Sequence, residues 1–199
     1  NSSNFSDGIV PDSLTGVGDI TVMYHEIFHS LGLEHPDDNS AFPEDKNSRE
    51  FTLMAGEFKK EGGAEYITNN QSYVVASTPM IYDIAPLQYL YGANSLYNSE
   101  DTYYSYDPNT PFIQTIWDGG GNDTLDLSNF NQKNILNLED GQSSTIGFDV
   151  NWSMDNNLGI AFNAIIENAK GGSGADQITG NKHENNIQGN GGDDIIDGG

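Results

Sequence analysis

Residues 171–179 read Gly171-Gly172-Ser173-Gly174-Ala175-Asp176-Gln177-Ile178-Thr179 and fit the nonapeptide pattern G-G-x-G-x-D-x-U-x, in which U is a large apolar residue. Residues 180–188 and 189–197 continue in the same register, with Ile187 and Ile196 at the apolar position. A more distant copy of the pattern spans residues 118–125. Three consecutive repeats favour a parallel β-roll over the alternative, a flexible tail rich in Gly, Asn and Asp.

The same repeats predict calcium sites. Their glycines allow tight turns in which backbone carbonyls and Asp carboxylates face a Ca²⁺ ion, which prefers many oxygen ligands. The apolar residue of each repeat is expected to point into a thin core. In the middle repeat Asn185 replaces the Asp, so the site there is expected to be weak. The candidate ligands within the repeats are Gly172, Gly174, Asp176, Gly189, Gly191 and Asp194.

The charge of the chain agrees with cation binding. The 199 residues include 7 Lys and Arg and 30 Asp and Glu, so the formal net charge is −23. Such acidity argues against nucleic acid and anionic membranes as partners. The chain has no cysteine for a disulfide, and it contains no apolar run long enough to span a bilayer.

A second motif, at residues 25–35, predicts a zinc site. It reads His25-Glu26-Ile27-Phe28-His29-Ser30-Leu31-Gly32-Leu33-Glu34-His35 and fits H-E-x-x-H-x-x-G-x-x-H. On a helix, His25 and His29 project from one face and can share one zinc ion. Gly32 can adopt a left-handed conformation and end the helix, so that His35 returns as a third ligand. Three nitrogens leave one coordination position for water, and Glu26 can take a proton from that water.

The alternative for these histidines is a set of ordinary core or surface imidazoles. Three of the four histidines in the chain occupy the three ligand positions, which favours the zinc site over coincidence.

The elements around these motifs indicate an α+β protein. One helix is expected from an N-cap at Asp19 to about Leu31, and a second from residues 77–79 to Gly92. Beyond residues 94–100, apolar residues alternate with Gly, Asn, Asp and Thr, which is typical of strands and turns. The predicted domains are residues 1–97 and 98–199. The apolar face expected for the first helix comprises Ile20, Met23, Ile27, Phe28 and Leu31.

Together these motifs resemble the serralysins, a family of bacterial metzincin zinc proteases with a C-terminal calcium β-roll. Further stretches carry the resemblance: residues 77–94, the run Ile116-Trp117-Asp118 before residues 119–123, and Ile166-Glu167-Asn168-Ala169. The resemblance runs from about Gly18 to Gly199. It implies that residues 1–97 are the C-terminal portion of a metzincin catalytic domain, followed by a truncated calcium-binding β-roll or β-sandwich.

The resemblance also implies roles for single residues. Met54 matches the methionine of the Met-turn beneath the zinc, and its alternative is an ordinary core methionine. Residues in and before the distant copy at 118–125, together with two residues shortly before residue 171, match two neighbouring calcium sites of the family. These implied ligands are Asn98, Glu100, Thr102, Asp118, Gly120, Gly121, Asp123, Ile165 and Glu167.

The chain departs from the family pattern in two places. Gly56 stands where the family has a tyrosine that stabilises the oxyanion of the reaction, and Tyr66 and Tyr73 are the candidates to replace it. Serralysins also carry a large half-domain before the zinc helix, whereas only 24 residues precede His25 here. That part is expected on another polypeptide, or to have been removed, or never to have been present.

The sequence therefore favours a secreted zinc endopeptidase of serralysin type, or a piece of one, exported in one step from a bacterium. Its expected cofactors are Zn²⁺ and Ca²⁺, and its expected partners are protein or peptide substrates and a separate N-terminal fragment. The alternative from another class is a non-catalytic, calcium-dependent binding or scaffolding module with a relic zinc site. Gly56 supports that alternative, and the intact Glu26 opposes it.

Overall fold

The computed structural model describes residues 17–56 and 74–199, with side chains from residue 20 onward. Two helices, α1 (Val17–Ser30) and α2 (Ile81–Tyr91), and two short 3₁₀ helices, η1 (Pro36–Asp38) and η2 (Glu44–Lys46), precede a strand-rich part. The strands of that part are β1 (Tyr103–Ser105), β2 (Gln114–Ile116), β3 (Thr124–Asp126), β4 (Ile135–Asn137), β5 (Ser143–Ser144), β6 (Leu158–Ile160), β7 (Asn168–Lys170), β8 (Gln177–Thr179), β9 (Asn186–Gln188) and β10 (Ile195–Asp197).

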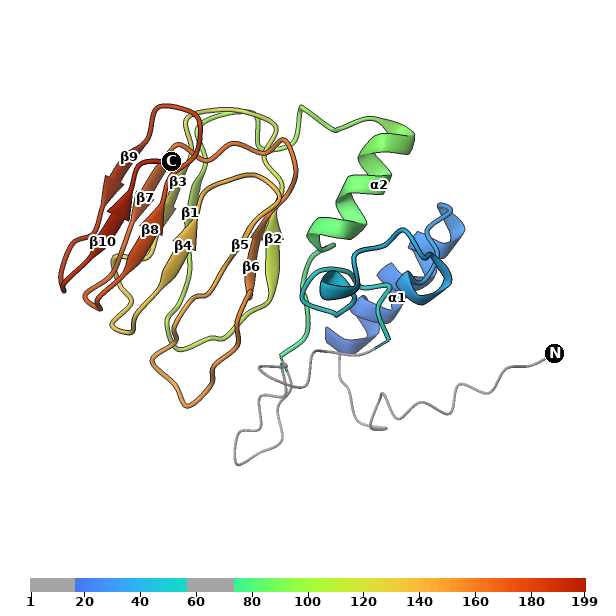
Figure 1. Cartoon of the computed structure of the whole chain (residues 1–199), viewed down its shortest axis with the longest axis horizontal. Coiled ribbons are helices and arrows are strands. Elements are labelled where there is room, and N and C mark those ends of the chain that lie inside the picture. Colours follow the sequence, from blue (N-terminus) through green and yellow to red (C-terminus); the bar gives the residue numbers. More distant parts are fainter. Residues whose placement is uncertain (1–16, 57–73) are drawn as a thin grey trace.

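The strand-rich part winds as a roll of two parallel sheets (Figure 1). Strands β7, β8, β9 and β10 begin at residues 168, 177, 186 and 195, nine residues apart, and alternate between the two sheets. Every second strand therefore pairs in parallel, with Asn168 opposite Asn186 and Gln177 opposite Ile195. This arrangement agrees with the predicted β-roll.

The apolar residue of a repeat is buried only where its strand has neighbours on both sides. Leu125 on β3 and Ile178 on β8 are 0% exposed. Ile187 on β9 is only partly buried, and Ile196 on β10 is 49% exposed, contrary to the expectation for every repeat. Among the described residues, strands β9 and β10 lie at the edges of their sheets, so each has a neighbouring strand on one side only.

A third sheet, with the order β2-β6-β5, was not predicted from the repeats. Strands β2 and β6 pair in parallel and β5 pairs with β6 in the opposite direction. This sheet lies next to α2 in Figure 1. The side chain of Ile81 packs so closely on Gly159 of β6 that a Cβ on Gly159 would lie 2.8 Å from it.

Helix α1 begins at Val17, two residues before the expected cap at Asp19, and only part of its expected apolar face is buried. Phe28 is 4% exposed, and Tyr24 and Leu31 pack against the core. Other members of that face remain 40–50% exposed, because they lie on the side of the helix that the described residues leave uncovered. These are Ile20, Met23 and Ile27.

Helix α2 begins at Ile81, later than the expected start at residues 77–79. Residues 76–78 instead attach to the strand-rich part: Ala76 bridges to Ile113, and the Ser77 amide donates to the Ile113 carbonyl over 3.0 Å. The helix contains Pro86 and ends at Gly92, whose φ is +85°, as predicted.

Helices and strands thus occupy successive parts of the described chain. None of its helices has the length and apolar character that a bilayer span requires. The assignment of the first part to a metzincin catalytic domain and the boundary between residues 97 and 98 stay predictions.

Candidate metal centre

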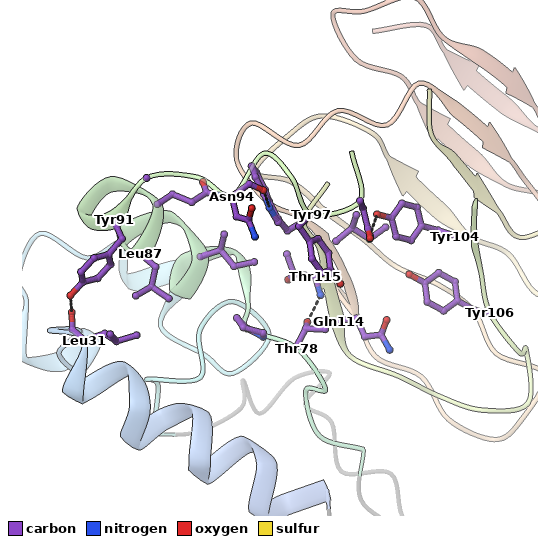
Figure 2. A pocket seen from close by; sticks show the side chains of 17 residues that line it. Leu31, Thr78, Leu87, Tyr91, Asn94, Tyr97, Tyr104, Tyr106, Gln114 and Thr115 are labelled. Carbon is purple, nitrogen blue, oxygen red and sulfur yellow. Dashed lines mark hydrogen bonds between the residues drawn. The ribbon is translucent and has the colours of Figure 1, made fainter. Parts of the chain in front are cut away.

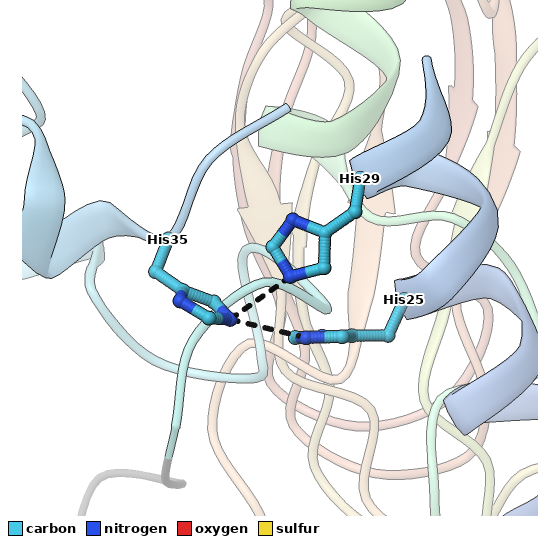
Figure 3. Close-up of side chains that lie close together, drawn as sticks. All are labelled: His25, His29 and His35. Atoms are coloured by element: carbon cyan, nitrogen blue, oxygen red, sulfur yellow. Dashed lines mark hydrogen bonds between the residues drawn. The ribbon is translucent and has the colours of Figure 1, made fainter. Parts of the chain in front are cut away.

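Three imidazole rings converge beside α1 (Figure 3). Their potential ligand atoms all lie within 4.8 Å of one another. The Nε2 atom of His35 is 3.2 Å from that of His25 and 3.1 Å from that of His29. Gly32, two residues after the end of α1, adopts a φ of +96°, which agrees with the predicted turn between His29 and His35.

The opposite ring nitrogens have acceptors. The Nδ1 atom of His25 donates to the Leu53 carbonyl over 2.8 Å, and that of His29 donates to the Leu33 carbonyl over 2.9 Å. The Nδ1 atom of His35 is 3.5 Å from a carboxylate oxygen of Asp38. A carbonyl oxygen only accepts, so the proton of His25 and of His29 must be on Nδ1 in the neutral rings.

This arrangement fits a metal ion. With their protons on Nδ1, His25 and His29 both direct Nε2 lone pairs toward the same point, and His35 could donate to only one of them. Burial lowers the pKa of His25. The bond to Leu53 opposes this effect, and repulsion from His29 and His35 adds to it. The lowered pKa favours the neutral ring, which is the form that binds a metal. A tetrahedral ion at zinc–nitrogen distances of about 2.0–2.1 Å would separate the nitrogens by roughly 3.3 Å.

Other predicted residues of this centre lie on α1 or in the segment after Leu53. Glu26 follows His25 on α1 and is exposed. Met54 is 2% exposed and belongs to the core, directly after the residue that accepts from His25. Gly56 is exposed, with open space where a Cβ would lie. The two tyrosines considered as its substitutes, Tyr66 and Tyr73, lie outside the described residues.

The first predicted calcium cluster is assembled by segments far apart in sequence. Asp123 accepts from the Thr102 amide over 2.7 Å, and its own amide donates to Glu167 over 2.8 Å. Gly121 approaches both the Glu100 carbonyl and the Asp123 carboxylate so closely that a Cβ would lie under 3.0 Å from each. Asp118, 1% exposed, accepts from the Gly120 amide over 2.9 Å.

The donor set of this cluster fits a cation. Oδ2 of Asp123 is buried without a hydrogen-bond donor among the described residues. Burial raises the pKa of Asp123 to about 6, against the bond from Thr102, and repulsion from Asp118 and then Glu167 adds to the rise. A bound cation would remove this repulsion. Two further predicted ligands lie at its margins: Asn98 donates to the Tyr104 hydroxyl, and Ile165 precedes Glu167 by two residues.

The second predicted calcium cluster joins successive repeats. The Asp176 amide donates to the Asp194 carboxylate over 2.9 Å, and the Gly191 amide donates to the Gly172 carbonyl over 3.0 Å. Asp176 also accepts from the Gly172 amide over 2.6 Å. A Cβ on Gly189 would collide with Asp194, and one on Gly174 would collide with the Gln132 carbonyl. The structure therefore brings the repeat residues together as the register predicts. In it, backbone amides donate hydrogen bonds to the carboxylates of Asp176 and Asp194.

A cavity of about 610 Å³ lies between α2 and β2 (Figure 2), and its lining includes Asn98, at the margin of the first calcium cluster. The described residues of its walls include no charged side chain. It is bordered by two bonds that join the parts of the chain: the Tyr91 hydroxyl donates to the Leu31 carbonyl, and the Thr115 amide donates to Thr78. Its aromatic lining is Tyr91, Tyr97, Tyr104, Tyr106 and Trp117.

The sequence reasoning missed the acceptors that orient the histidines. The Leu33 carbonyl, four residues after His29, could have been expected from the position of the helix end. The Leu53 carbonyl lies 28 residues from His25, and no local pattern marks it. Asp38, three residues after His35, was the remaining local signal.

Comparison with known proteins agrees with these features. The family model described as Peptidase M10 serralysin C terminal matches residues 83–199. Serralysin of Proteus mirabilis is 37% identical over 210 residues, which cover 92% of this chain and 40% of that protein. Serralysin of Photorhabdus luminescens is 37% identical over 82% of this chain and 36% of its own length. Metalloprotease AprA of Pseudomonas entomophila is 36% identical over 79% of this chain and 36% of its own length.

The chain thus spans about two fifths or less of the length of these relatives. The family model covers more than half of the chain, from the third residue of α2 through strands β1 to β10. The chain therefore belongs to the serralysin family of M10 peptidases.

Proposed function

We propose that this chain is the zinc-binding and calcium-binding part of a secreted serralysin-type endopeptidase, which hydrolyses peptide bonds in proteins. The observation that carries the proposal is the convergence of three Nε2 atoms, two of them on rings whose Nδ1 protons are committed to carbonyls. His25, His29 and His35 would hold the zinc. The names of the relatives, serralysin and metalloprotease, support a proteolytic rather than another hydrolytic role.

Zinc would supply polarisation of the scissile carbonyl and a lowered pKa for nearby water. The chain itself would supply the proton transfers. The carboxylate of Glu26 would accept a proton from the attacking water and later deliver that proton to the nitrogen of the leaving amine. The substrate would be an extended polypeptide, which a sheet edge on the upstream part of the full protease would hold.

The β-roll would take calcium through its two clusters of carboxylates and carbonyls and would be exported from a bacterium in one step. An upstream half-domain, in the same precursor or on a separate fragment, would complete the substrate cleft.

One observation favours a second candidate, a calcium-dependent binding module with a relic zinc site. Gly56 offers no hydroxyl where the family has its tyrosine, so an oxyanion formed there would lack one donor.

Casein digestion by the zinc- and calcium-loaded chain tests the proposal. Glu26→Ala should keep zinc and lose about 10²–10⁴-fold in activity, because it removes the base but no ligand. His29→Ala should lose zinc as well, whereas His183→Ala, at the histidine outside the cluster, should lose neither. A wild type that binds zinc through these histidines without cleaving casein would favour the binding module. Equal zinc content in wild type and His29→Ala would overturn the metal centre itself.

A further inference from the structure

Asp83, at the start of α2, is a fully buried carboxylate outside the histidine cluster. It is 0% exposed and accepts four hydrogen bonds from three donors. Its Oδ1 atom accepts from the Thr52 hydroxyl over 2.6 Å, and its Oδ2 atom accepts from the amides of Leu53 and Met80, each over 2.9 Å. The Leu53 amide also reaches Oδ1 over 3.1 Å. A carboxylate with this many donors fixes the segment that supplies them.

The segment so fixed is the one that orients the first histidine. The Leu53 amide donates to the Asp83 carboxylate, and the Leu53 carbonyl accepts from Nδ1 of His25 over 2.8 Å. A shift of this residue would therefore move the acceptor of the His25 Nδ1 proton. Because the two ring nitrogens are rigidly linked, it would also turn Nε2 away from the point where the three rings meet.

The carboxylate itself is anchored from the other side. Tyr82, its neighbour on α2, donates its amide to the Phe51 carbonyl over 2.9 Å. Ile81 packs on Gly159 of β6, and Thr78 accepts from the Thr115 amide of β2 over 2.8 Å. The start of α2 is thus held against the third sheet, and these contacts fix the position of Asp83.

We propose that Asp83 is a positioning residue for the zinc centre: through the Leu53 peptide it sets the orientation of His25 and so the affinity of the three histidines for zinc. The inference rests on the proposed function, since it assumes that these histidines take zinc. Asp83 is the first residue of the region that the family model matches, and it lies 58 positions after His25. The proposal gives this residue a role in the histidine centre.

The ionisation state of Asp83 agrees with this role. Burial raises its pKa to about 6, and the bonds from Thr52, Leu53 and Met80 limit the rise. At pH 7 the group is therefore mostly ionised and accepts from all three donors.

The test is a zinc competition titration of the full chain with calcium present. Asp83→Ala removes every acceptor and should weaken zinc binding about 10- to 100-fold, the usual cost of losing an outer-shell partner. Asp83→Asn keeps one oxygen for the Leu53 amide and should recover most of that affinity. The matched control for a general loss of stability is Leu125→Ala, at a residue of β3 that is 0% exposed and lies in a different sheet from the one that α2 packs against.

A second readout separates positioning from a general loss of stability. In NMR spectra of the imidazole protons, the Nδ1 proton signal of His25 should shift or broaden in Asp83→Ala, whereas that of His29, held by Leu33, should remain. If Asp83→Ala does not fold, Thr52→Val, which removes one donor to the carboxylate, carries the test and should show the same His25 change with a smaller loss of affinity.

Equal losses of zinc affinity in Asp83→Ala and Leu125→Ala, or an unchanged His25 signal in Asp83→Ala or in Thr52→Val, would overturn this role for Asp83. His29→Ala in the same titration keeps the two proposals distinct. If His29→Ala binds zinc as tightly as wild type, the zinc centre is wrong. If only His29→Ala weakens binding, the centre stands and the role of Asp83 falls.

Discussion

The β-roll and the histidine-bearing helix α1 are stabilised in different ways. In the roll, the central residues of inner strands, such as Leu125, Ala169 and Ile178, are 0% exposed. On α1, Ile20 and Met23 are 40% and 50% exposed, and the helix contacts the core mainly through Phe28. The roll is ordered by many equivalent apolar contacts between repeats, whereas the histidine centre is ordered by a few directional bonds.

This difference determines what each region should tolerate. Loss of one hydrogen-bond acceptor in the roll affects one turn among several, but loss of the acceptor at Leu53 affects one of only three ligands. Conversely, the roll gathers carboxylates at its turns, so its fold should depend on cations far more than that of α1. Four perturbations, from the largest expected effect to the smallest, test this comparison.

Calcium removal should have the largest effect, and it should fall on the roll. Asp118 and Asp123 are almost fully buried beside Glu167, and without a cation their charges repel. Circular dichroism of the full chain should lose its β signal in EGTA and regain it with Ca²⁺ but not with Mg²⁺, which resists irregular oxygen cages. Identical spectra in EGTA and in calcium would contradict a calcium-dependent roll.

The same experiment has a pH dependence with a definite sign. The pKa of Asp123 is raised to about 6, chiefly by burial, so its carboxyl gains a proton as the pH falls through that value. Protonation competes with calcium. More calcium should therefore be needed for the same β signal at pH 5 than at pH 7.

Truncation of a core side chain should come next. Leu125→Ala, in the middle of β3, should lower the free energy of unfolding by about 2–5 kcal/mol, because it leaves a cavity among fully buried neighbours. Met23→Ala, on the exposed side of α1, should change it by less than about 0.5 kcal/mol. Urea denaturation with calcium present measures both. Equal losses would mean that α1 is covered as completely as the roll.

The two regions also differ in how far the sequence predicted them. In the roll, the nonapeptide register placed β8 and β10 correctly because pairing follows the repeat itself. It did not predict the exposure of Ile196, which depends on what lies beside an edge strand, nor the sheet β2-β6-β5, whose residues carry no repeat.

In the histidine centre, the spacing of His25, His29 and His35 predicted their convergence, since helix geometry and the turn at Gly32 are local. The supports of that geometry were not predictable in the same way. Leu53 acts through its backbone, which leaves no trace in residue type, and Asp83 reads as an ordinary first-turn acidic residue of α2. Both act through tertiary contacts between segments far apart in sequence.

Gly56→Tyr tests whether the centre lacks a donor. Gly56 does not require a left-handed conformation, and a Cβ at this position would meet no described atom within 4 Å. A hydroxyl that reaches the oxyanion should raise kcat by up to about 10²–10³-fold. KM should change little, because the bond would form mainly in the transition state.

Casein turnover by wild type and Gly56→Tyr, both loaded with zinc and calcium, measures this effect. A lower kcat in Gly56→Tyr would show that another donor already serves the oxyanion. Tyr66 and Tyr73 would then be the first residues to replace with phenylalanine.

The smallest effect is expected at an ion pair on the surface of the roll. Lys170 on β7 lies 2.8 Å from Asp126 on β3, whose side chain is only 6% exposed, and the Tyr103 hydroxyl donates to the same carboxylate. Burial alone would raise the pKa of Asp126, but the bonds from Lys170, Ser128 and Tyr103 outweigh it and hold the pKa well below its usual value.

Lys170→Met should therefore lower the urea midpoint at pH 7, since it leaves a buried carboxylate without its cation. Lys182→Met is the matched control: its ammonium is 3.9 Å from Asp140 and its side chain is 76% exposed, so its loss should be within error. A carboxyl with a lowered folded-state pKa contributes its stability above the unfolded pKa of about 3.9 and loses it as the pH falls toward the folded value. The difference between wild type and Lys170→Met should thus be constant from pH 5 to pH 8, in saturating calcium, and shrink below about pH 4. A difference that persists unchanged in acid would mean that Lys170 acts through the packing of its alkyl chain across β3 and β7 rather than through its charge.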